Sequence, residues 1–145
     1  MTISTASTAP QGFDKDLQGN RPGVPIEANV SYTGSFGYAA GAGGAVTQAT
    51  SKATGVTLSQ LSGEITMNGA ALAADAIASF TLTNTWIAAT DVLVLNHGSA
   101  GTVGKYVLGA QCASGTAVIN VTNISAGSLS EAIVIRFVVI KGAIT

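Results

Sequence analysis

The sequence predicts an all-β fold: a jelly-roll-like β-sandwich of about eight strands that follows an extended N-terminal arm. From residue 45 onward, short segments of alternating apolar and polar residues are separated by Gly, Asn, Ser or Asp, as in strands joined by turns. The apolar residues in these segments are mostly β-branched, which favours strands. The last segment, 132–141, is apolar at almost every position and indicates a central strand.

Composition restricts the possible partners. The 145 residues are enough for about one domain. Only 9% of residues are charged and the net charge is -1, so no basic surface is available to bind a nucleic acid. No apolar run reaches the roughly 18 residues of a membrane-spanning helix, and Arg136 interrupts the longest one. We therefore expect neither nucleic-acid nor membrane binding.

The ends and the single cysteine complete this picture. Residues 1–10 contain no basic residue and no continuous apolar segment, which argues against a secretory signal and for a protein that stays where it is made, in the cytoplasm. Cys112 stands alone, and no histidine cluster accompanies it, so we expect no disulfide, metal or cofactor. The low charge favours a subunit of an assembly.

Residues 1–44 form the predicted arm. They contain all three prolines and end in the glycine-rich stretch 37–44, so neither helix nor strand periodicity is sustained. Apolar residues spaced along the arm distinguish it from a solvated linker and can anchor it on another surface. The anchors that we expect to contact a neighbouring surface or another copy are Phe13, Ile26, Val30, Tyr32, Phe36 and Tyr38.

One part of the arm has strand character. Residues 26–32 alternate between apolar and polar, and they are bounded by Pro25 and Gly34. Such a segment can add to the sheet edge of a neighbour. Packing back onto its own domain is the alternative, and the sequence favours neither.

The sandwich domain spans residues 45–145. Glycine-, asparagine- and serine-containing stretches separate its strands, and residues 68–75 are expected to connect two strands despite their alanines. The expected strands are 45–50, 55–58, 63–68, 76–84, 91–97, 105–112, 117–123 and 132–141. Their expected core comprises Val56, Leu58, Ile65, Met67, Phe80, Leu82, Val92, Val94, Val107, Ile119, Val121, Ile133, Ile135 and Phe137.

Two corners of the sandwich share a pattern. A strand ends at Asn84 and the next begins at Asp91; a second strand ends at Asn123, and Glu131 precedes the last strand. Asn and Asp side chains can bond backbone groups at a bend, so both corners are expected to be held in this way.

The last strand has two apolar faces. Ile133, Ile135 and Phe137 lie on one face, while Val134, Arg136 and Val138 lie on the other. We therefore expect both faces to be covered, one by the second sheet and the other by the arm or by a neighbouring subunit. Arg136 is expected to pair with Glu64 or Glu131, or to lie at a subunit seam.

Catalysis is not expected. His97 is the only histidine, and no nucleophile with an orienting carboxylate accompanies it in a recognisable pattern, so a hydrogen bond within its loop or a place in an interface is the simpler role. Trp86, the only tryptophan, lies in a predicted corner. There it can stack on a sugar, anchor a protein interface or pack over the end of the sandwich.

Three stretches carry a family resemblance: Thr47-Gln-Ala-Thr-Ser-Lys-Ala-Thr-Gly55, Gly63-Glu-Ile-Thr-Met-Asn68 and Ile124-Ser-Ala-Gly-Ser-Leu-Ser-Glu-Ala-Ile-Val-Ile135. In them the chain resembles small capsid decoration, or cement, proteins of tailed bacteriophages and prophages. The resemblance covers residues 45–143 and does not extend to the arm.

This resemblance implies a structural virion protein that lies on the outside of the phage head and clamps adjacent major capsid subunits. It implies a homo-oligomer, a dimer or a trimer, assembled in the host cytoplasm. The alternative is a receptor- or glycan-binding module of a phage fibre, with Trp86 and His97 in the contacting loops. Neither function needs an enzyme activity.

Overall fold

The computed structural model describes residues 37–38 and 41–142. This part of the chain contains eight β-strands and no helix, so the predicted all-β fold is confirmed. The strands are β1 (Gly43–Thr47), β2 (Val56–Thr57), β3 (Ser62–Thr66), β4 (Ile77–Thr83), β5 (Val92–Ser99), β6 (Tyr106–Ala113), β7 (Thr116–Asn123) and β8 (Val134–Ile140).

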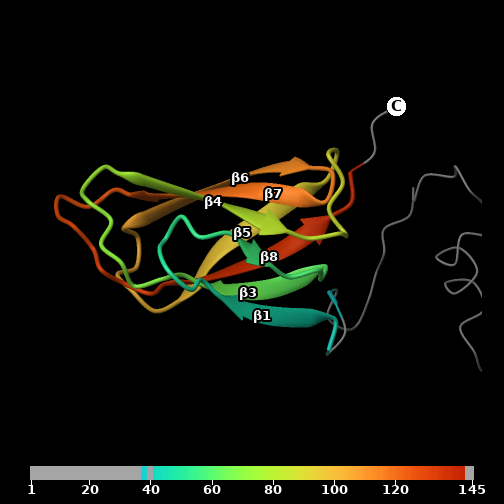
Figure 1. Cartoon of the computed structure of the whole chain (residues 1–145), viewed down its shortest axis with the longest axis horizontal. Helices are drawn as coiled ribbons and strands as arrows, with labels where there is room; N and C mark the ends of the chain where they lie inside the picture. The colour runs from blue at the N-terminus through green and yellow to red at the C-terminus, as the bar shows by residue number, and fades with distance from the viewer. Residues whose placement is uncertain (1–36, 39–40, 143–145) are drawn as a thin grey trace, which may run out of the picture. The chain divides into compact units, whose positions relative to one another are not determined.

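The strands form two four-stranded sheets, which lie on each other as a sandwich (Figure 1). Sheet A has the order β1-β3-β8-β5, and sheet B has the order β2-β4-β7-β6. Strands β5 and β6, the matching edges of the two sheets, contact each other and close one side of the sandwich. Strands β1 and β2 lie at the opposite side.

Two strand pairs are parallel. β1 pairs with β3, and β2 pairs with β4, whereas every other named pair is antiparallel. The first four strands alternate between the sheets, so each parallel pair is linked through a strand of the other sheet. A jelly roll of two Greek keys is built from antiparallel pairs, so this topology is that of a related sandwich.

The core lies between the sheets and follows the expected alternation. In β4, β7 and β8 every second residue is buried, as period-two side-chain placement requires. The largest fully buried apolar side chains are Phe137, Ile65, Met67, Leu82, Ile119, Ile133, Ile135, Val121 and Val139. Of these, all but Val139 were predicted from the sequence.

The predicted core was wrong at three positions. Val92, Val94 and Val107 are exposed, while Leu93 and Tyr106 take the inward positions. β5 is apolar on both faces, so its alternation does not select the inward face. Polar neighbours of the same parity, Asn96 in β5 and Gln111 in β6, mark the outer face of each strand.

The expectation that β8 is covered on both faces is confirmed for one face, and for the other it stays a prediction, because the arm and a second copy lie outside the described residues. Its inward side chains are buried by sheet B, but Arg136, Val138 and Ile140 are exposed on the other face. Among the described residues nothing covers this second face. Residues 1–36, which include most of the predicted arm, lie outside the described part.

Buried asparagines hold the two predicted corners. Asn84 accepts a hydrogen bond from the N–H of Trp86 and donates to the carbonyl of Gln60. Asn123 accepts from the N–H of Ser125 and donates to three carbonyls, those of Leu72, Ala73 and Gly127. Both asparagine side chains thereby satisfy backbone groups where water cannot reach.

The loops gather at two ends of the sandwich (Figure 1). Because β5 begins at Val92 and ends at Ser99, the corner before it and the loop after it lie at opposite ends. We call the first the Tyr38 end, which also contains Trp86 and Lys141. We call the second the Glu131 end, which contains the loop 99–105.

Candidate functional site

An exposed apolar patch lies on the outer face of sheet A. We call it the sheet A patch and define it as Val92 and Val94 of β5 with Val138 and Ile140 of β8. Val92 is paired with Ile140 and Val94 with Val138 in the antiparallel register, so the four side chains form a block two strands wide. Their exposed fractions are 55%, 47%, 37% and 52% in the order Val92, Val94, Val138, Ile140.

A charged pair borders this patch. The Nε of Arg136 in β8 donates to the Oε1 of Glu64 in the neighbouring strand β3, at 2.6 Å. Of the two partners that the sequence allowed, the structure selects Glu64. Both side chains are about half exposed, so in the isolated chain the pair contributes little to stability, about 0–1 kcal/mol.

Gly98 leaves space for the side chain of Arg136 to lie along the surface of the sheet. A Cβ at position 98 would stand 2.8 Å from the Cγ and 3.0 Å from the Cδ of Arg136, so the arginine stem runs over the bare glycine backbone. β5 and β8 have a register irregularity at this point, between His97 and Ser99. The side chain of Arg136 therefore lies along the sheet beside the sheet A patch.

The outer face of sheet B differs in its chemistry. Threonine, serine, asparagine and glutamine occupy most of its positions, and the exposed apolar residues Ile77, Val107 and Val118 stand among them. In the register, Ile77 is opposite Thr122 and Val118 is opposite Thr81, so each has a threonine across the strand gap. No block like the sheet A patch is formed on this face by the described strands.

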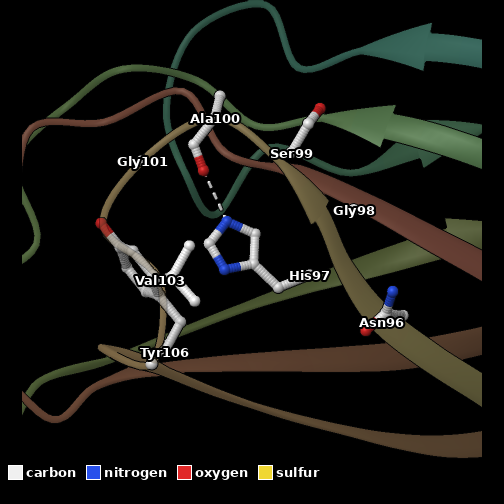
Figure 2. A pocket seen from close by; sticks show the side chains of 9 residues that line it. Asn96, His97, Gly98, Ser99, Ala100, Gly101, Val103 and Tyr106 are labelled. Carbon is white, nitrogen blue, oxygen red and sulfur yellow. Dashed lines mark hydrogen bonds between the residues drawn. The ribbon is translucent and has the colours of Figure 1, made fainter.

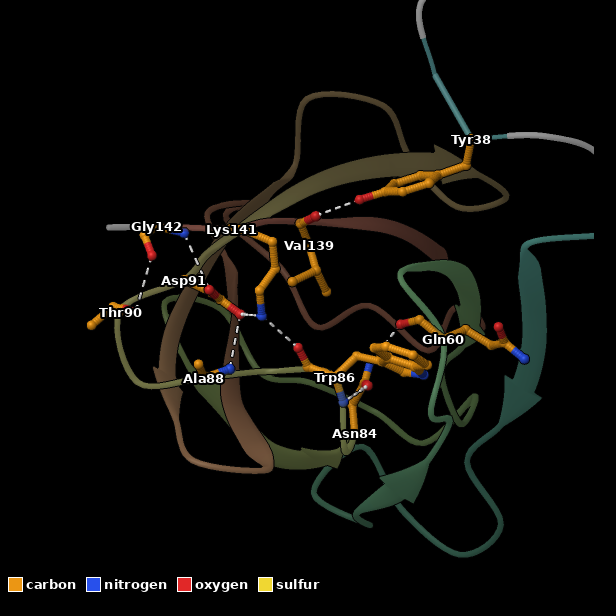
Figure 3. A network of polar contacts seen from close by, with 10 residues as sticks. All are labelled: Tyr38, Gln60, Asn84, Trp86, Ala88, Thr90, Asp91, Val139, Lys141 and Gly142. Atoms are coloured by element: carbon orange, nitrogen blue, oxygen red, sulfur yellow. Dashed lines mark hydrogen bonds and ion pairs between the residues drawn. The ribbon is translucent and has the colours of Figure 1, made fainter. Parts of the chain in front are cut away.

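At the Tyr38 end, polar contacts tie the terminal strand to the corner before β5 (Figure 3). Asp91, whose side chain has no exposed surface, is paired with Lys141 at 2.5 Å and accepts the N–H of Ala88 at 2.8 Å. Lys141 also donates to the carbonyl of Trp86. The hydrogen bond from Lys141, and then that from Ala88, hold the pKa of the Asp91 carboxyl below its usual value.

Tyr38 is anchored at the same end. Its hydroxyl donates to the carbonyl of Val139 at 2.7 Å (Figure 3). The N–H of Val139 donates to the carbonyl of Leu61. Tyr38 is thus the one predicted arm anchor inside the described residues. The others, Phe13, Ile26, Val30, Tyr32 and Phe36, lie outside them.

At the Glu131 end, one carboxylate holds the loop 99–105. Glu131 accepts hydrogen bonds from the N–H of Thr102 at 2.9 Å, the hydroxyl of Thr102 at 2.6 Å and the hydroxyl of Tyr106 at 2.7 Å. The bonds from Thr102, and then that from Tyr106, lower the pKa of Glu131. Burial, and then Glu131, raise the pKa of Tyr106.

Lys52 also stabilises the Glu131 end, and the sequence did not predict this role. The side chain is buried, and its Nζ donates to the backbone carbonyls of Asn68 at 2.7 Å and Glu131 at 2.5 Å. Burial lowers the pKa of Lys52, against the attraction of Glu131. The sequence signal was weak, since one lysine in a serine- and threonine-rich stretch usually lies in solvent.

His97 lines a shallow pocket of about 270 Å³ at this end (Figure 2). Its Nε2 lies 2.6 Å from the carbonyl oxygen of Ala100, and its ring meets the ring of Tyr106 edge-on, with centroids 5.7 Å apart. Backbone carbonyl and aromatic ring are positioning contacts, not the nucleophile and carboxylate of a catalytic histidine. This hydrogen bond within the loop is one of the two non-catalytic roles that the sequence predicts for His97.

Trp86 and His97 do not form one site. Trp86 is 56% exposed at the Tyr38 end, whereas His97 is part of the pocket at the Glu131 end. The strand β5 separates them. The two residues proposed for a glycan contact therefore belong to opposite ends of the sandwich.

Cys112 and possible metal or membrane binding are the remaining features of the described segments. Cys112 is half-buried, and burial raises the pKa of its thiol, which disfavours the reactive thiolate. In residues 37–38 and 41–142, no three His, Cys, Asp or Glu side chains are placed to hold a metal ion. No helix in that part of the chain is long and apolar enough to cross a membrane.

Comparison with known proteins found no matching family model, no similar curated protein and no similar solved structure.

Proposed function

We propose that this chain is a structural virion protein, a capsid decoration or cement protein that binds the outside of a tailed-phage head. The observation that supports it best is the outer face of sheet A, where four exposed β-branched apolar side chains stand together beside an ion pair. Apolar surface of this kind gains free energy when a protein surface covers it, at about 25 cal/mol per Å². The resemblance noted in the sequence names the surface, the joints between major capsid subunits.

The polar groups support a binding role instead of a chemical one. The carboxylates of Asp91 and Glu131, the amine of Lys52 and the amides of Asn84 and Asn123 all bond to nearby loops. They hold the two ends of the sandwich and converge on no common reacting atom. A clamp of this kind works through buried area at each joint, repeated over many copies.

The first test is the copy number of this chain in purified particles of the encoding phage, measured by quantitative mass spectrometry against the major capsid protein. A decoration protein is expected in hundreds of copies. A handful of copies would indicate the tail or fibres, and absence from the particle would overturn the proposal.

The alternative function is glycan binding by a fibre module, and Trp86 is the observation that favours it. The indole is more than half exposed at the end that also contains Tyr38, which is 43% exposed. Aromatic rings in such positions can stack on sugars. Because Trp86 is the only tryptophan, its fluorescence should respond to a bound sugar, and an unchanged spectrum across host-surface glycans would argue against this function.

A further inference from the structure

Strand β1 is an open edge. In sheet A it pairs with β3 alone, and the described residues place no strand on its other side. The opposite edge, β5, lies against β6 along much of its length, whereas β1 contacts β2 of the other sheet only slightly, because β2 is only 2 residues long. Within the described part, β1 is therefore the edge with room for a further strand.

The backbone of β1 is oriented for such a strand. The N–H of Gln48, directly after β1, donates to the carbonyl of Thr66 and so continues the ladder with β3. Backbone groups along a strand alternate in direction, so the N–H and C=O groups of Ala45 and Thr47 point to the open side. These groups are the donors and acceptors that an added strand uses.

β1 lacks the features that commonly prevent a further strand from pairing with an edge strand. Edge strands usually carry a charge, a proline or a bulge that prevents further strands from adding. β1 reads Gly-Gly-Ala-Val-Thr and has none of these features, whereas β5 has a register irregularity between His97 and Ser99. An edge without these features can accept a further strand.

The core is incomplete beside this edge. Val46 of β1 and the neighbouring Leu58 and Leu61 are only partly buried, although they pack on the core. An added strand with apolar residues on its inner face would cover them. The occupant should therefore alternate between apolar and polar residues.

We propose that β1 accepts the arm segment 26–32 of a second copy of this chain as an added strand. Its odd-numbered positions are Glu27, Asn29 and Ser31, and its even-numbered positions, Ile26, Ala28, Val30 and Tyr32, are apolar. The apolar positions face Val46 and Leu58, and the polar ones face solvent. The proposal concerns contacts between copies and holds whether or not the copies bind a capsid.

The position of Tyr38 selects a second copy as the donor. Its hydroxyl is bonded to Val139 of β8, and β3 lies between β8 and β1. Only the five residues 33–37 lie between the segment 26–32 and Tyr38. A neighbouring copy supplies the segment without the need for these five residues to lead it back to the open edge. Each copy then donates one arm and accepts another, either by mutual exchange in a dimer or around a larger closed ring.

Cysteine trapping tests the contact directly. In a Cys112→Ala background, Asn29→Cys in one copy and Ala45→Cys in a second, differently tagged copy are co-expressed and oxidised, and Ser31→Cys replaces Asn29→Cys to cover the adjacent register. We expect a disulfide-linked pair of unlike copies. The matched control replaces Ala45→Cys with Ser79→Cys, an exposed position on the outer face of sheet B, and should give no pair.

Two outcomes of this trapping overturn the proposal. Equal or no trapping with Ala45→Cys and Ser79→Cys would remove β1 as the acceptor. A cross-link that forms only when both cysteines are in one chain, without a covalent dimer, would assign the segment to its own molecule.

A proline at the edge gives an independent readout. Ala45→Pro removes an N–H that points away from β3, a position at which an edge strand tolerates proline. We expect an unchanged circular dichroism spectrum and a loss of oligomer mass by light scattering, whereas Thr47→Ala, which keeps the N–H, should retain the oligomer. An unchanged oligomer of folded Ala45→Pro would contradict the proposal, and if that variant fails to fold, the trapping experiment decides.

Discussion

The outer faces both belong to four-stranded sheets, but they carry different side chains. On sheet A, one apolar block is formed by Val92, Val94, Val138 and Ile140. The side chain of Arg136 lies over Gly98 beside this block. On sheet B, threonines separate the exposed apolar residues. Threonine favours strands as valine does, but its hydroxyl bonds to water. Strand formation thus explains the backbone of both faces, and the apolar block on sheet A is the observation on which the proposed contact rests.

The largest expected effect comes from placing a charge in the sheet A patch. Val138→Lys puts an ammonium in the centre of the sheet A patch, where a covering surface would have to desolvate it. We expect the affinity for particles or for other copies to fall by about 30-fold or more, as for the loss of a central interface residue. The measurement is sedimentation of the purified protein with and without phage heads.

Val118→Lys is the matched control on sheet B. Val118 is exposed in the middle of β7, and its surroundings are polar. The same substitution there should leave binding and folding unchanged. If both lysine variants bound equally, the contrast between the faces would have no functional meaning.

A smaller effect is expected for Arg136→Ala. In the isolated chain the exposed Arg136–Glu64 pair contributes under about 1 kcal/mol, so the free energy of unfolding should change little. If the pair is desolvated by a partner, truncation costs about 2 kcal/mol or more in binding. Chemical denaturation and analytical ultracentrifugation of the same variant separate these two quantities, and equal changes in both would place Arg136 outside the contact.

Acid should weaken the two ends of the sandwich. The pKa values of Asp91 and Glu131 are held below their usual values of 3.8 and 4.5 in the folded chain. Their ionised forms therefore contribute stability above these values, and the contribution is lost as the pH falls through the lowered pKa values. The thermal midpoint should fall as the pH is lowered below about 4.5.

Asp91→Asn tests the origin of this acid dependence. It should lower the thermal midpoint at neutral pH, because it removes the ionic partner of Lys141, and it should flatten the decrease in acid. A wild-type acid profile in this variant would show that Asp91 does not contribute.

The smallest effect is expected for Gly98→Ala. The new Cβ would stand 2.8 Å from the Cγ of Arg136 and lift the arginine from the face. The fold should lose under about 1 kcal/mol, since a flexible side chain can move away. Binding should weaken by a few-fold if a flat face matters, and Gly109→Ala, with open space at its Cβ position on the other sheet, is the control.

Local pattern was sufficient for much of this structure. Alternation and turn residues placed all eight strands, and the asparagines predicted the two bonded corners. These features depend on residues close together in the chain. The same pattern predicted most of the core, because β4 and β7 are polar on one face and apolar on the other.

The tertiary structure decided what the pattern left open. β5 is apolar on both faces, so only its packing on β8 and β6 shows that Leu93 faces inward and Val92 outward. The partner of Arg136 depends on which strand lies beside β8, and the parallel pairing of β1 with β3 leaves β1 as the open edge.

Alternation thus determines that a strand has two faces and which residues share each of them. It does not determine which face a second sheet covers, or which strands become neighbours. Those depend on contacts between residues far apart in the chain, and for this protein they decide where its exposed apolar surface and its free edge lie.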